Sequence, residues 1–169
     1  MDGDIAPLDE ISTLARQHKA WIMVDEAHAT GVFGPNGAGI VEEFNLSSEI
    51  EIQMGTLSKA LGGSGGYVAG SRELVNWLIN RARSFVYSTA LPPTVAATAI
   101  AAIDIVSNEP KRRQQLRDNA YFLAKELTTL GYTLANSRSQ ILAIIIGTTS
   151  QTMALAAELF SQGIFAPGI

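Results

Sequence analysis

The chain has 169 residues, of which 47% are hydrophobic and 17% charged, a balance typical of a globular domain rather than a disordered chain. Its net charge of -4 argues against a nucleic-acid surface, and the lack of cysteine excludes a disulfide framework and a thiolate metal site. No stretch resembles a secretory leader or a membrane span, so we expect a cytoplasmic protein with no metal and with no nucleic-acid or membrane partner.

Apolar spacing and turn residues predict alternating helices and short strands in the first part of the chain. Residues 7–18 repeat apolar side chains at helical spacing, and residues 21–24 form an apolar run typical of a buried parallel strand. Residues 29–39 contain four glycines and one proline, which predicts a loop. Further predicted elements are a helical turn at 41–44, strands at 49–54, 67–69 and 85–87, and helices at 71–83 and 92–106.

A change of character follows the helix at 92–106, which is apolar nearly all round and is therefore expected to be buried. Pro110 interrupts the chain, and a charged helix at 111–130 comes next. Two antiparallel strands are predicted at 132–134 and 140–146, and a helix at 150–162. We therefore expect two domains. Residues 1–106 are predicted to form part of an α/β domain with a mostly parallel sheet, and residues 107–169 part of a small α+β domain.

Polar groups capable of chemistry follow the first two predicted strands. Asp25 and His28 come directly after the first strand, and Lys59 comes just past the second. Ligands of open α/β sheets bind beyond the carboxyl ends of the strands, so these side chains can face one crevice. A carboxylate, an imidazole and an amine together suit pyridoxal 5'-phosphate, with the lysine forming a Schiff base and the acid pairing with the pyridine nitrogen.

The surroundings of Lys59 suit the phosphate of that cofactor. Thr56 and Ser58 offer hydroxyl groups, and the glycine-rich turn at 62–66 offers backbone N–H groups. Taken singly, each residue has a simpler explanation: Lys59 as a solvated surface group, Asp25 as a turn residue and His28 as a structural histidine. The run G-T-L-S-K-A-L-G-G is an unusual surface sequence, which favours the chemical interpretation.

Two other classes of protein remain open at this point. The run V-D-E-A-H after an apolar strand is also what an ATP-driven helicase uses to hold magnesium. That function requires a phosphate loop G-x-x-x-x-G-K-[ST], whereas Lys59 is followed by Ala60. A catalytically silent relative kept for dimerisation is the other alternative, and the intact set of Asp25, His28 and Lys59 argues against it.

The two motifs together resemble a known family. The runs V-D-E-A-H-A-T-G-V-F-G-P-N-G-A-G and G-T-L-S-K-A-L-G-G-S-G-G-Y-V-A-G-S are similar to those of the α-oxoamine synthases, and the resemblance covers essentially the whole chain. These are pyridoxal-phosphate enzymes of fold type I that condense an amino acid with an acyl-CoA and release carbon dioxide. The resemblance implies part of their large domain followed by part of their small C-terminal domain.

The resemblance also implies a role for each site residue. Lys59 would be the Schiff-base lysine, Asp25 the partner of the pyridine nitrogen, and His28 the partner of the phenolic oxygen. Thr56, with Ser58 beside it, would bind the phosphate. Because the active sites of the family lie at a homodimer interface, Thr89, with Ser88, would reach the phosphate in the partner subunit.

The substrates follow from the branch of the family. The runs D-E-A-H-A-T-G-V and S-F-V-Y-S-T-A-L-P-P are most similar to the branch that joins L-alanine to pimeloyl-CoA, or to the pimeloyl-carrier-protein thioester, in biotin biosynthesis. The 2-amino-3-ketobutyrate CoA ligase, 5-aminolevulinate synthase and serine palmitoyltransferase branches are the alternatives. Members of the family are longer than this chain, so we expect a fragment that is inactive alone. In some relatives glycine stands where this chain has Ser58.

Overall fold

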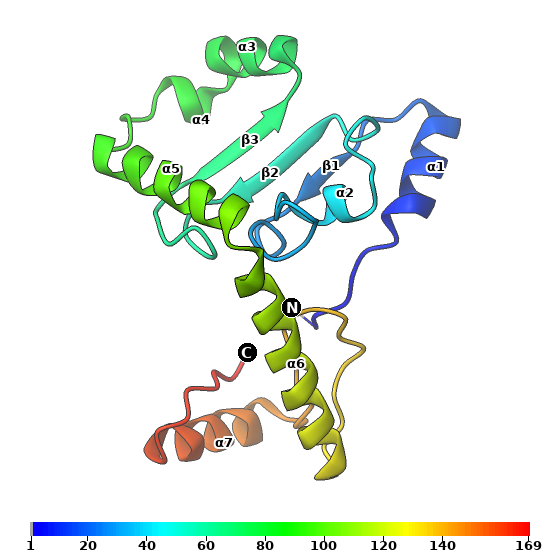
Figure 1. Cartoon of the computed structure of the whole chain (residues 1–169), viewed down its shortest axis with the longest axis vertical. Helices are drawn as coiled ribbons and strands as arrows, with labels where there is room; N and C mark the ends of the chain where they lie inside the picture. The colour runs from blue at the N-terminus through cyan, green and yellow to red at the C-terminus, as the bar shows by residue number, and fades with distance from the viewer. Residues whose placement is uncertain (1) are drawn as a thin grey trace. The chain divides into compact units, whose positions relative to one another are not determined.

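The computed structural model describes residues 2–169, and the chain folds as two compact units. One unit comprises residues 6–115, and the other comprises residues 2–5 together with 116–169. The three-stranded sheet in Figure 1 belongs to the first unit, and α7 (Thr149–Ser161) belongs to the second. The assignment of residues 1–106 and 107–169 to two enzyme domains stays a prediction.

The sheet of the first unit has β2 (Ile52–Thr56) between β1 (Met23–Asp25) and β3 (Gly66–Gly70), as Figure 1 shows. β1 and β2 run parallel, and β2 and β3 run antiparallel. Asp25 lies opposite Met54 in the parallel pair. The carboxyl ends of β1 and β2 therefore share one edge of the sheet, and the segments that follow both strands begin there.

The core of this unit collects on one side of β1. Val24 is buried, whereas its neighbours Met23 and Asp25 are exposed, as the two-residue alternation of a strand requires. The side chains that bury with Val24 come from several segments: Leu8, Ile22, Ile40, Val41, Leu46, Ile50 and Leu61. Because Val24 points into this core, Asp25 is directed to the open side of the strand.

Two helices accompany the core. α1 (Leu8–His18) begins after Pro7, and its first turn carries Asp9 and Glu10, which suit the positive end of a helix. Ser12 of α1 donates a hydrogen bond to the Glu49 carboxylate from the segment before β2. α2 (Ile40–Glu43) is a single turn that buries Ile40 and Val41.

The segment after β3 forms two helices. α3 (Arg72–Arg81) is capped by Ser71, whose hydroxyl accepts from Leu74 N at 3.2 Å. α4 (Arg83–Val86) occupies residues where a strand at 85–87 is predicted, so that prediction is wrong. Aromatic and β-branched residues favour strands only where a neighbouring strand accepts their hydrogen bonds. Here Phe85 N and Val86 N both donate to Ala82 O within a helical turn.

The two longest helices meet at the predicted break. α5 (Pro93–Asn108) ends just before Pro110, where α6 (Pro110–Thr129) begins. The expected burial of the apolar helix is wrong for this chain, because no residue of α5 is buried and Ile100 is 64% exposed. An all-apolar helix needs neighbours on every side. Residues 2–169 do not supply them.

The second unit has less regular structure than predicted. In place of the two strands predicted at 132–134 and 140–146, the structure has a single antiparallel bridge between Leu134 and Ile144. α7 begins with a complete capping box, in which Thr148 and Gln151 each bind the backbone of the other. Arg138 N donates to Gly3 O at 2.9 Å and so ties residues 2–5 to this unit. Within residues 2–169, no helix combines the length and the apolar character that crossing a membrane requires.

Candidate functional site

The first part of the candidate site is the turn that follows β1. Asp25 ends the strand, is exposed, and accepts a hydrogen bond on Oδ1 from Ala27 N at 2.8 Å. The chain then closes a helical turn, because Ala29 N and Thr30 N both donate to Glu26 O at 2.8 Å. His28 lies within this turn and is exposed. The turn thus presents a carboxylate and an imidazole three residues apart at one strand end.

The second part is the loop between β2 and β3, which carries Lys59. Leu57 N donates to Gly65 O at 2.9 Å and Gly63 N donates to Leu57 O at 2.6 Å, so the loop is closed at its base. Gly62 N donates to Lys59 O at 3.0 Å, which makes a tight turn directly after the lysine. The Lys59 side chain is exposed. The loop holds the backbone of Lys59 in place and leaves its amine open to a ligand.

Two hydroxyl groups stand beside the lysine. Thr56 Oγ1 lies 2.7 Å from Ser58 Oγ and 3.0 Å from Gly65 O, and it accepts from Ser58 N at 3.2 Å. The hydroxyls are therefore ordered by the backbone of the same loop. Hydroxyls and N–H groups clustered at a strand end form a surface that suits a phosphate group.

The parallel register brings the two parts together. Because Asp25 lies opposite Met54, the His28 turn and the Lys59 loop leave the sheet at the same edge. The predicted residues thus all lie at or just past the carboxyl ends of two adjacent strands: Asp25, His28, Thr56, Ser58 and Lys59. This donor set, an amine, a carboxylate, an imidazole and paired hydroxyls, fits pyridoxal phosphate.

Ser88 and Thr89 lie in the segment between α4 and α5. Ser88 donates its hydroxyl to Thr89 O at 3.4 Å and its N–H to Phe85 O at 3.2 Å, which are both local bonds. Leu91 packs close to Gly65, where a side-chain carbon on the glycine would lie 3.1 Å from Leu91 Cδ1. The segment therefore passes beside the Lys59 loop. A role for Ser88 and Thr89 in a partner subunit stays a prediction.

Sequence reasoning missed Glu26, which is fully buried between Asp25 and the turn. Its carboxylate accepts from Ile40 N and Val41 N, each at 2.8 Å. Burial raises the pKa of Glu26, the two N–H groups oppose that effect, and the neighbouring Asp25 charge adds to it. The one available signal was the two-residue alternation from Ile22 and Val24, both buried, which places position 26 on the same side of the strand.

Tyr67 was also missed. Its hydroxyl lies 2.8 Å from Thr30 Oγ1, so β3 is linked to the turn that carries His28. The phenol ring crosses Gly55 of β2 so closely that a side-chain carbon there would lie 2.4 Å from the hydroxyl oxygen. The spacing of Thr30 and Tyr67 along the sequence offers no sign of this contact.

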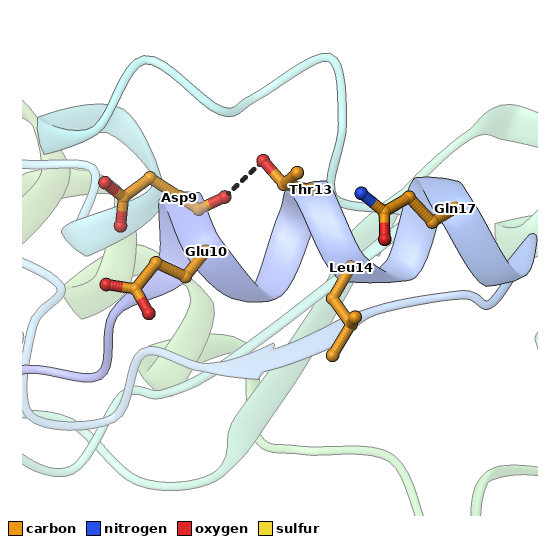
Figure 2. Close-up of a pocket in the computed structure, with 5 residues that line it drawn as sticks. All are labelled: Asp9, Glu10, Thr13, Leu14 and Gln17. Atoms are coloured by element: carbon orange, nitrogen blue, oxygen red, sulfur yellow. Dashed lines mark hydrogen bonds between the residues drawn. The ribbon is translucent and has the colours of Figure 1, made fainter.

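Two hollows lie elsewhere on the described surface. A cleft of about 590 Å³ runs between β2, β3 and the helices α3 and α4, with Tyr67, Val75, Leu78 and Phe85 among its lining residues. A second hollow of about 330 Å³ lies along α1. Its lining residues, which Figure 2 shows as sticks, are Asp9, Glu10, Thr13, Leu14 and Gln17. Asp25, His28 and Lys59 line neither of these two hollows, and all three residues are exposed.

The chain belongs to the aminotransferase class I and II family, whose model matches residues 1–169. Membership over the whole chain removes the ATP-driven helicase alternative for V-D-E-A-H. Two relatives, from Lysinibacillus sphaericus and Thermoanaerobacter pseudethanolicus, are named 8-amino-7-oxononanoate synthase. They are 46% and 47% identical over 169 residues, which is 100% of this chain and 43% of each relative. The chain thus spans less than half the length of these relatives.

Solved structures confirm the predicted fold class, a partial large domain of the fold-type-I transferases. Serine palmitoyltransferase from S. paucimobilis with a bound PLP–myriocin adduct matches 99% of this chain and 44% of its own, with a TM-score of 0.94 and 33% identity. The 8-amino-7-oxononanoate synthase of Francisella tularensis matches 98% of this chain and 49% of its own, with a TM-score of 0.86 and 28% identity.

Proposed function

We propose that these 169 residues supply the lysine-bearing part of a pyridoxal-phosphate acyltransferase that condenses L-alanine with pimeloyl-CoA or a pimeloyl-carrier protein. The product would be 8-amino-7-oxononanoate, in biotin biosynthesis. The observation that supports the proposal best is the shared edge of β1 and β2, from which Asp25, His28 and Lys59 all emerge. The names of the relatives at 46% and 47% identity support the choice of substrates.

Each side chain has a role in this proposal. Lys59 Nζ would hold the cofactor covalently, Asp25 would bind its ring nitrogen, and His28 would bind its phenolic oxygen. When bound, pyridoxal phosphate supplies an electron sink for the carbon that loses a bond. Once the amine of alanine has displaced it from the cofactor, the free Lys59 Nζ would be the base that takes the proton from the alanine α-carbon.

In this proposal, serine and threonine hydroxyl groups bind the phosphate of the cofactor. Thr56 and Ser58 are already ordered beside Lys59 by the loop, so they would bind the phosphate at little entropic cost. Ser88 and Thr89 would complete the phosphate site of the partner subunit in a homodimer. In this scheme residues 1–106 belong to the large domain and residues 107–169 to the small domain of a cytoplasmic enzyme.

The test is CoA release by the complete gene product that carries these residues. Alanine, glycine and serine are each combined with acetyl, succinyl, pimeloyl and palmitoyl thioesters. We expect the highest kcat/KM for alanine with the pimeloyl donor. Lys59→Ala should abolish both turnover and the visible absorption that borohydride bleaches, whereas Lys111→Ala on exposed α6 should change neither. Near-normal turnover by Lys59→Ala would remove the proposal.

A sister activity is the second candidate, because serine palmitoyltransferases resemble the chain with a TM-score of 0.94. A preference for serine with the palmitoyl donor would select it, and a preference for glycine with a short donor would select another branch. We also propose that the 169-residue chain alone does not turn over substrate, since it spans 43% of the length of its relatives and leaves Asp25, His28 and Lys59 exposed. CoA release by the isolated chain would contradict this.

A further inference from the structure

Glu26, next to the candidate pyridine partner Asp25, carries a buried carboxyl group that has no role in the proposed chemistry. Glu26 is 1% exposed, although it directly follows the exposed Asp25 at the end of β1. A carboxylate taken from water to this depth is costly unless hydrogen-bond donors compensate it. Both oxygens of Glu26 therefore need hydrogen-bond donors within the folded chain.

Both oxygens are used on α2. Oε2 accepts from Ile40 N and Oε1 from Val41 N, each at 2.8 Å, and these are first-turn N–H groups that have no partner inside a helix. Gly39 makes the approach possible, because its φ is 132° and a side-chain carbon there would lie 2.5 Å from the Glu26 carboxyl carbon. The end of β1 and the start of α2 are thus joined by one carboxylate.

The backbone of Glu26 joins two more segments. Its N–H donates to Met54 O at 2.7 Å and so extends the pairing of β1 with β2 toward the Lys59 loop. Its carbonyl oxygen accepts from Ala29 N and Thr30 N and so closes the turn that carries His28. One residue therefore fixes β2, the His28 turn and α2 relative to one another.

We infer that Glu26 is a positioning residue, which sets the directions of the Asp25 carboxylate and the His28 imidazole toward the cofactor ring by anchoring their turn to α2. The inference rests on the proposed function. It requires a carboxylate, because the two N–H groups need two acceptors. An amide at this position offers one acceptor and turns an N–H₂ group toward a backbone N–H.

The test uses Glu26→Gln in the complete gene product, with Glu42→Gln as the matched control. The Glu42 carboxylate also holds backbone N–H groups, but those of Asn36 and Ala38, which belong to the glycine-rich loop and not to the turn at 26–30. Affinity is measured by titrating the protein without cofactor with pyridoxal phosphate, and the absorption maximum of the bound cofactor is recorded. We expect Glu26→Gln to weaken binding about tenfold and to shift the absorption band, and Glu42→Gln to do neither.

A measurement on the unmutated protein covers the case in which Glu26→Gln fails to fold. Coupling between two sites is reciprocal, so cofactor binding should slow amide hydrogen exchange at Ile40 and Val41 at least severalfold, and leave Asn36 and Ala38 unchanged. Equal affinity and an equal spectrum for Glu26→Gln, or unchanged exchange at Ile40 and Val41, would overturn the inference alone. Failure of the unmutated protein to bind pyridoxal phosphate would overturn the proposed function as well.

Discussion

Gly39 and Glu26 show how closely single residues are matched around the candidate site. The carboxylate fills the space in which any side chain at position 39 would stand. It can do so only because a glycine tolerates the backbone conformation found there, with φ at 132°. The buried acid and the glycine therefore depend on each other, although thirteen positions separate them in the sequence.

Replacement of Gly39 by alanine should destabilise the protein by about 3 kcal/mol, because the new carbon meets the Glu26 carboxyl group and the backbone is strained as well. Urea unfolding of the complete gene product measures the loss. Gly62→Ala is the control, since Gly62 also has a positive φ of 61° but has open space around it. The control should lose only about 1 kcal/mol. Equal losses for the two variants would contradict the packing argument.

Titration of the buried Glu26 carboxyl group should make the free energy of unfolding depend on pH. Burial raises the pKa of Glu26 above its ordinary value of 4.5, so the folded state binds this proton more tightly than the unfolded state does. The stability from this proton is complete below pH 4.5 and is lost as pH rises through the raised pKa. The unfolding free energy of the unmutated protein, minus that of Glu26→Gln, should therefore fall over this window. A difference that rises with pH would contradict the assignment.

At the scale of elements, the glycine-rich loop after the His28 turn is held by side chains from both of its sides. Glu43 Oε2 accepts from Gly34 N at 2.9 Å. The buried Arg113 guanidinium donates to Pro35 O at 2.7 Å and to Val106 O at 2.5 Å. Since Val106 lies in α5 and Arg113 in α6, one side chain joins the helix junction to the loop. A segment without regular structure is thereby given a defined position.

Arg113→Lys should lose about 2 kcal/mol of stability and speed protease cleavage within residues 31–39. A single ammonium group does not reproduce the fork with which guanidinium binds two carbonyl oxygens. Limited proteolysis and urea unfolding measure both effects. Arg112→Lys provides the control, because Arg112 is 68% exposed and pairs with Glu109 at the surface. Similar cleavage rates for the two variants would show that the loop is held by other contacts.

For the molecule as a whole, the main feature is uncovered apolar surface. The cleft beside β3 has Val68, Ile79 and Phe85 in its lining, and each of them is more than a third exposed. Trp77 of α3 and Ile100 of α5 are each 64% exposed. Large apolar side chains exposed in a cleft of this kind mark places that other protein surfaces cover.

The 169-residue chain, produced alone, should therefore self-associate as its concentration rises to about 100 µM. Light scattering measures the mean mass. The substitutions Ile79→Lys and Phe85→Lys should weaken self-association by placing positive charge in the cleft. The control substitutions Thr13→Lys and Gln17→Lys on α1 add the same charge away from the cleft and should have little effect on self-association. A chain that stays monomeric throughout the range would contradict this prediction.

Local patterns were sufficient for much of the fold and of the candidate site. Helix ends follow from nearby residues, such as the Ser71 cap and Pro110, because the groups that satisfy a helix end lie within a few positions of it. Asp25 and Lys59 were found because polar residues after apolar strands meet at one sheet edge. The strand predicted at 85–87 and the predicted burial of α5 were wrong. Both depend on which neighbouring segments pack against these residues rather than on the residues themselves.

By itself, the sequence determined the α/β alternation, the strand ends that carry Asp25, His28 and Lys59, and the family to which they point. Only the tertiary structure decided that Glu26 is buried on α2, that Tyr67 binds Thr30, and that Arg113 holds the glycine-rich loop. The physical reason is the separation along the sequence over which each effect acts. Backbone propensity and hydrophobic period act over a few residues, whereas these contacts join groups 14, 37 and 78 positions apart, whose meeting depends on the packed fold.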